Sequence, residues 1–127
     1  MKLLLDTHAL IWWAVDDPKL SRRVRTAIGN RGNQVFVSAA SVWEVATKAR
    51  LGKLGWPAEA GTVPDYVRVQ GFDDLPITLE HAELAGAMRI EHRDPFDRML
   101  IAQATAEGLV LASVEELFDS FGIRRLW

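Results

Sequence analysis

Four acidic residues occupy positions in the sequence where carboxylates could carry out chemistry: Asp6, Glu44, Asp97 and Glu115. Carboxylates that share a pocket raise one another's pKa unless a cation keeps them ionised. An all-oxygen acidic set suits Mg²⁺ or Mn²⁺, which keep several waters and complete their coordination with a substrate phosphate. If the fold brings the four acids together, they predict a divalent-metal site for chemistry on phosphate esters.

The residues around Pro95 predict the start of a helix. Pro95 suits the first helical position, with Asp94 before it as the N-cap and Asp97 two residues after it. Capping and the helix dipole can account for both acids without any chemistry. The apolar run over 99–102, however, indicates a helix buried on most of its surface, so Asp97 is partly desolvated and needs a cation. We therefore predict that Asp97 is a metal ligand and that Asp94 caps the helix or supports a ligand.

The elements that position these acids alternate between strand and helix. Apolar stretches at 3–5, 34–38 and 109–112 predict buried strands. Helices are expected over 9–15, from Ser21, over 41–50, 63–70, 79–90 and 95–107 and briefly through Phe118, with further strands at 75–78 and 123–127. This alternation predicts one α/β domain over 1–127, a three-layer sandwich with a mostly parallel central sheet flanked by helices. Ligands of such sheets bind beyond the carboxyl ends of the strands, where we expect the acids to meet.

Local capping offers a simpler account of some of these residues. Ser41 and Glu44 have the spacing of a capping box, as do Ser113 and Glu116, and Thr7 is placed to cap the first helix. His81 lies between apolar helical positions and is expected at the surface. His8 and His92 are expected to be structural or to contact substrate rather than to act as acid and base.

Composition excludes several classes of protein. The chain has 127 residues, 49% of them hydrophobic, and no cysteine, so disulfide scaffolds, thiolate nucleophiles and cysteine-based zinc sites are excluded. Asp6 follows only three leucines, too early for a signal peptide or a membrane span, so we expect a cytoplasmic protein with no membrane partner. A net charge of −2 argues against a wholly basic surface but permits a basic rim around an acidic site.

Four segments together resemble the PIN-domain ribonuclease family, and specifically the VapC-type toxins of bacterial toxin-antitoxin pairs. They are Leu3 to His8, Ser38 to Glu44, His92 to Ala104 and Phe121 to Ile123. The resemblance implies a Mg²⁺- or Mn²⁺-dependent endoribonuclease that is inhibited by a cognate VapB-type antitoxin and is usually a homodimer. It places the acids of the family on Asp6, Glu44 and Asp97.

The fourth position departs from the family pattern. Such proteins commonly have Thr-x-Asp after the last buried strand, where this chain has Ser113-Val114-Glu115. Glu115 keeps the charge on a longer side chain, and this difference puts a second metal position in doubt. Candidate substrate-binding residues are Thr7, Arg93, Arg98 and Ser113, and Lys48 and Arg50 could also rim the pocket, although ordinary surface ion pairs explain the basic residues equally well.

Two other functions remain open at the level of sequence. Another Mg²⁺-dependent phosphotransfer enzyme, such as a phosphatase, usually has a second acid two residues after the first, where this chain has His8. A non-catalytic module could keep the acids only to bind an antitoxin or RNA. Four tryptophans are either part of the core or exposed at a dimer interface or an antitoxin groove: Trp12, Trp13, Trp43 and Trp56.

Overall fold

The computed structural model describes residues 1–127 and has a five-stranded sheet at its centre. The strands are β1 (Lys2–Leu5), β2 (Gln34–Ser38), β3 (Asp73–Leu75), β4 (Val110–Ala112) and β5 (Arg124–Leu126). They lie in the order β3-β2-β1-β4-β5, and every neighbouring pair is parallel. All carboxyl ends therefore lie at one edge of the sheet.

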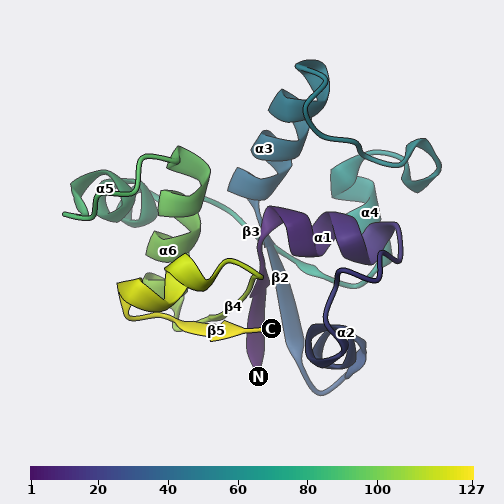
Figure 1. Cartoon of the computed structure of the whole chain (residues 1–127), viewed down its shortest axis with the longest axis horizontal. Coiled ribbons are helices and arrows are strands. Elements are labelled where there is room, and N and C mark those ends of the chain that lie inside the picture. The colour runs from purple at the N-terminus through teal and green to yellow at the C-terminus, as the bar shows by residue number, and fades with distance from the viewer.

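Helices connect the strands and cover both faces of the sheet (Figure 1). They are α1 (Thr7–Ala14), α2 (Arg22–Gly29), α3 (Ala39–Arg50), α4 (Val63–Val69), α5 (Leu79–Ala87), α6 (Pro95–Glu107) and the short 3₁₀ helices η1 (Ala58–Ala60) and η2 (Glu116–Phe121). Figure 1 shows α1, α2 and α4 on one side of the sheet and α5, α6 and η2 on the other, while α3 projects beyond the ends of the strands. No helix is both long enough and apolar enough to cross a membrane.

Alternation along β1 divides the core into two. Leu3 and Leu5 pack with residues of α1, α2 and α4, whereas Leu4 packs with residues of α6 and with Phe118. Successive side chains of a strand point to opposite faces, so a strand that is apolar throughout must be covered on both sides. This arrangement confirms the predicted three-layer α/β sandwich, with a sheet that is wholly rather than mostly parallel.

Most predicted elements differ from the observed ones by one or two residues at an end, and two differ more. The edge strand expected at 75–78 is β3, which ends at Leu75 because Pro76 follows and has no backbone donor for a ladder. The helix expected over 79–90 ends at Ala87, and the chain from Met88 leaves the helical conformation. The loop over 88–94 is longer than expected as a result, and it borders the start of α6.

Three predictions about local capping are wrong. Asp6, not Thr7, caps α1, and Ser38, not Ser41, caps α3. Ser113 and Glu116 form no capping box, because Ser113 Oγ instead accepts a hydrogen bond from the backbone of Glu115 at 3.0 Å. The strands before α1 and α3 lead into these helices with at most one residue between them, so both helices begin earlier than the spacing predicted.

His81 is buried, which contradicts its expected place at the surface. Only 2% of the residue is exposed, and it forms a capping box with Thr78 at the start of α5. Its Nδ1 accepts from the Thr78 backbone at 3.1 Å, and its Nε2 lies 2.8 Å from Glu107 Oε1 on α6. His81 therefore joins α5 to α6 and takes no part in the acidic pocket.

Candidate metal centre

A pocket of about 250 Å³ lies at the carboxyl ends of the strands, where α1, α3 and α6 begin. The residues that line it are Asp6, Thr7, His8, Glu44, Lys48, Asp94, Asp97, Glu115 and Leu117. The structure thus brings together all four acids that the sequence singled out, together with Asp94. Their convergence follows from the parallel sheet, since each of β1, β2 and β4 leads into this edge.

Asp6 lies deepest in the pocket, with only 5% of the residue exposed. Its Oδ1 accepts a hydrogen bond from the backbone of Ala9 at 2.8 Å, which caps α1. Burial raises the pKa of Asp6 to about 6, although the hydrogen bonds from Ser113 and Ala9 act in the opposite direction. The charge of Asp97 raises this pKa further. Without a cation, the ionised form of Asp6 is therefore less stable in the folded protein than in the unfolded chain.

Glu44 has a partner on each carboxylate oxygen. Thr7 Oγ1 donates to Oε1 at 2.5 Å across 37 residues of sequence, and the ammonium of Lys48 donates to Oε2 from the next turn of α3. Glu44 is inside the helix rather than near its first amides, so the predicted capping role is wrong. Thr7 orients the Glu44 carboxylate within the pocket, which is a different role from the substrate contact that we predicted for it.

Asp97 and Asp94 have distinct roles at the start of α6. Asp94 Oδ1 accepts from the backbones of Phe96 at 2.9 Å and Asp97 at 3.0 Å, which confirms the predicted N-cap. Asp97 Oδ2 lies 2.8 Å from His92 Nε2. Burial raises the pKa of Asp97, the hydrogen bond with His92 lowers it, and the charges of Asp94 and Glu44 raise it. Asp97 is thus a partly buried carboxylate whose orientation is set by a histidine.

Glu115 reaches the pocket from the turn after β4. It is exposed, unlike Asp6 and Glu44, and its backbone donates to Ser113 Oγ. Ser113 is fully buried and contacts Asp6 through a side-chain hydrogen bond. Ser113 therefore supports the acids from behind, and Glu115 is the acid nearest to solvent.

Arg98 does not line the acidic pocket, contrary to its predicted role as a substrate-binding residue. Its guanidinium donates to backbone carbonyls of the α5–α6 loop region, including Ala85 and Met88 at 2.8 Å and His92 at 3.0 Å. These bonds use the donors that a phosphate would need. Arg93 is exposed and, with Arg98 and His92, lines a separate hollow of about 620 Å³ beside the acids.

Two further residues line the pocket, Lys48 and His8, and the prediction from sequence gave them only minor roles. Lys48 is four residues after Glu44, the spacing at which oppositely charged side chains meet on a helix, and that spacing was an available signal. The hydrogen bond with Glu44 raises the pKa of Lys48, so its ammonium stays protonated. His8 packs against Trp12, with ring centroids 5.5 Å apart.

The carboxylates that line the pocket are the type of ligand that a divalent cation takes, but they are not arranged as a complete coordination shell. The pocket offers carboxylate oxygens from four separate segments of the chain, and such oxygens are the ligands that Mg²⁺ and Mn²⁺ prefer. No group of three or more histidine or acidic side chains is arranged closely enough to hold a metal. In this arrangement Thr7 and Lys48 are bonded to the Glu44 carboxylate, and His92 is bonded to the Asp97 carboxylate.

The fold and the pocket place this chain among the α/β proteins that have a parallel sheet and an acidic pocket beyond the carboxyl ends of its strands. The PIN domain family model matches residues 3–123 of this chain. The chain therefore belongs to the PIN domain family, as the four sequence segments predicted.

Individual relatives agree with this assignment. Ribonuclease VapC16 of Mycobacterium tuberculosis is 40% identical over 62 residues, a stretch that covers 48% of this chain and 43% of that relative. The matched stretch thus spans less than half of the relative's length. The resemblance to VapC-type proteins is confirmed over that stretch.

Solved structures show the same fold over the whole chain. The VapBC2 structure from Rickettsia felis, bound to a promoter DNA fragment, has a TM-score of 0.72 at 14% identity and covers 99% of this chain and 98% of its own. The DNA-bound VapBC from Salmonella typhimurium has a TM-score of 0.70 at 22% identity, with coverage of 99% and 97%.

Proposed function

We propose that this protein is a divalent-metal-dependent endoribonuclease, the toxin of a toxin-antitoxin pair. The observation that carries the proposal is the gathering of Asp6, Glu44, Asp97 and Glu115 in one pocket at the carboxyl edge of a PIN-family sheet. The local similarity to a ribonuclease supports RNA as the substrate. A Mg²⁺ or Mn²⁺ ion, when bound, lowers the pKa of its water and stabilises charge on a phosphate.

The residues in and beside the pocket would have different roles in this function. Asp6, Glu44 and Asp97 would hold the cation, and Glu115 would join them from the pocket mouth. Thr7 fixes the Glu44 carboxylate and His92 fixes the Asp97 carboxylate, as outer partners commonly do at metal sites. Arg93, exposed in the neighbouring hollow, is the basic residue best placed to contact the RNA backbone.

The proposal is tested by incubating the purified protein with a mixed-sequence, single-stranded RNA in Mn²⁺, in Mg²⁺ and in EDTA. We expect cleavage to require the metal, because the acids otherwise repel one another and cannot activate water. A phosphatase would instead release terminal phosphate and leave the chain intact. A binding module would retain the RNA or the antitoxin without cleaving any substrate in either metal.

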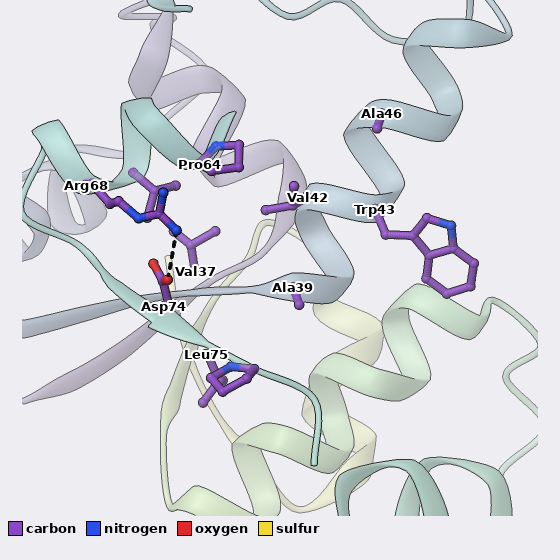
Figure 2. Close-up of a pocket in the computed structure, with 11 residues that line it drawn as sticks. Val37, Ala39, Val42, Trp43, Ala46, Pro64, Arg68, Asp74 and Leu75 are labelled. Carbon is purple, nitrogen blue, oxygen red and sulfur yellow. Dashed lines mark hydrogen bonds and ion pairs between the residues drawn. The ribbon is translucent and has the colours of Figure 1, made fainter. Parts of the chain in front are cut away.

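An apolar groove of about 490 Å³ is a second feature that fits this role (Figure 2). It lies between α3, α4 and β3, with Val42 facing Pro64 and with the Arg68–Asp74 ion pair, 3.4 Å long, at one end. The structural relatives include toxin-antitoxin complexes such as VapBC. We propose that an apolar segment of a cognate VapB-type antitoxin binds in this groove.

The antitoxin proposal predicts the effect of a charge in the groove. Ala46 is exposed on α3 and lines the groove, so Ala46→Glu should leave the fold intact but place a carboxylate against apolar partner residues. We expect antitoxin affinity to fall on the order of 100-fold. Ala49→Glu is the matched control, because Ala49 is exposed on the same helix and does not line the groove. Equal affinities of the two variants in a calorimetric titration would contradict this placement.

A homodimer remains part of the proposal. Of the four tryptophans considered, Trp12, Trp13 and Trp56 pack partly buried against the core, whereas Trp43 is 58% exposed. Trp43 meets Phe96 edge to face, with centroids 4.8 Å apart, and the two border a smaller apolar hollow of about 200 Å³. Only Trp43 of the four therefore supports an interface, and we propose that a second copy covers this hollow.

A further inference from the structure

Lys48 is the only lysine or arginine that lines the acidic pocket. It shares the lining of this pocket with five acids: Asp6, Glu44, Asp94, Asp97 and Glu115. Its ammonium is bonded to Glu44, and the charges of Asp94 and Asp97 also act on it. One positive charge thus lies among the acids that would hold a divalent cation.

The contact of Lys48 with Glu44 differs from an ordinary pair on a helix surface. The Glu44 side chain is 7% exposed and that of Lys48 is 32% exposed. Thr7 is bonded to one Glu44 oxygen and Lys48 to the other, so a metal can take the second oxygen only if the ammonium moves away from it. The Lys48 ammonium lies 5.9 Å from the centroid of Phe96, so it is bounded by an aromatic ring as well as by the acids.

We propose that Lys48 is an internal counter-cation of the metal site. It neutralises Glu44 in the metal-free protein and leaves that carboxylate when a divalent cation binds. This inference rests on the proposed function, since it assumes that the pocket takes a metal. It makes Lys48 a positioning residue that stabilises the empty pocket and weakens metal binding.

Two opposite effects of Lys48→Met follow. Methionine keeps an unbranched, apolar side chain but removes the charge. Without metal, the variant should melt at a lower temperature, because Glu44 is left buried with one partner. With metal, the dissociation constant for Mn²⁺ should fall about tenfold, because a positive charge no longer competes with the cation. If Lys48 only formed an ordinary ion pair on the helix surface, Lys48→Met would lower the melting temperature slightly and would leave the Mn²⁺ dissociation constant unchanged.

The experiment titrates Mn²⁺ into the full chain at pH 7.5 and follows free Mn²⁺ by electron paramagnetic resonance, with thermal melts in EDTA. Lys48→Arg is the conservative variant and should retain the wild-type dissociation constant. Lys53→Met is the matched control, because Lys53 is exposed and forms no ion pair. If Lys48→Met does not fold in EDTA, Lys48→Gln provides a second neutral side chain for both measurements.

The outcomes separate this inference from the proposed function. The inference about Lys48 is supported if Lys48→Met or Lys48→Gln binds Mn²⁺ more tightly than the wild type while Lys48→Arg and Lys53→Met do not. It is also supported if the wild type binds no Mn²⁺ and the neutral variant does. Measurable wild-type binding that Lys48→Met leaves unchanged or weakens would overturn the role of Lys48 while leaving the metal site in place. Failure of every form to bind Mn²⁺ at millimolar concentration would overturn both.

Discussion

Replacing Asp97 with asparagine should reduce RNA cleavage by more than about 100-fold while the protein remains folded. Loss of even an outer partner of a metal site typically costs about 10- to 100-fold, and Asp97 is proposed as a ligand itself. Asparagine keeps the shape of the side chain and its place in the first turn of α6. Burial already disfavours the ionised form of Asp97, so removing the charge should leave metal-free stability equal or higher. Cleavage rates and EDTA melts measure the two effects.

Asp94 provides the matched control, because it lies three residues away and lines the same pocket. Its carboxylate accepts hydrogen bonds from the backbone amides of Phe96 and Asp97, and asparagine caps a helix equally well. Asp94→Asn should therefore keep both stability and cleavage, whereas Asp94→Ala should cost about 1 kcal/mol of unfolding free energy. An inactive Asp94→Asn beside an active Asp97→Asn would reverse the assignment of cap and ligand.

The sequence predicted those parts of the site that depend on local signals and on the direction of the strands. Asp6 directly follows the apolar run Leu3 to Leu5 of β1, so its place at the carboxyl edge follows from the parallel sheet. The Asp94-Pro95 pair carries its own helix start, and the structure confirms it. Both inferences needed only the order of residues and the geometry of regular elements.

The incorrect predictions concern residues whose partners are distant in the sequence. Glu44 has the spacing of a capping residue, but Thr7, 37 residues away, determines where its carboxylate lies. From the sequence, Arg98 was expected to be available to bind substrate. Its guanidinium instead donates to carbonyls that are exposed only because α5 ends at Ala87. His81 is buried because α6 packs over it. No local pattern encodes such contacts, since they form only when the elements assemble.

Replacing Asp6 with asparagine should stabilise the metal-free protein by up to about 3 kcal/mol at pH 7.5. The pKa of Asp6 rises from 3.8 to about 6 on folding, so the folded state binds a proton more tightly than the unfolded state does. The stability this contributes is present below pH 3.8 and is lost as the pH rises through about 6. Above that range the wild type holds a buried, ionised carboxylate at a cost of about 1.4 kcal/mol for each pH unit between the two values.

Asparagine avoids this cost and keeps the structural contacts of Asp6. Its side-chain oxygen can still accept from Ala9, so α1 remains capped. The stability difference between variant and wild type in EDTA should therefore be small near pH 4 and grow until pH 7. Melts across this range measure it, and a variant less stable than the wild type at pH 7.5 would contradict the assigned pKa.

Saturating Mn²⁺ should reverse the order of stability at pH 7.5. A cation bound only by the folded state stabilises it by mass action, and the wild type can offer the ionised Asp6 that the cation needs. Asp6→Asn lacks that charge, so its melting temperature should change little between EDTA and Mn²⁺. The same carboxylate then destabilises the empty pocket and stabilises the loaded one, as expected of an acid kept for binding rather than for folding. An equal rise in melting temperature for both proteins would show that Asp6 does not contribute to the metal site.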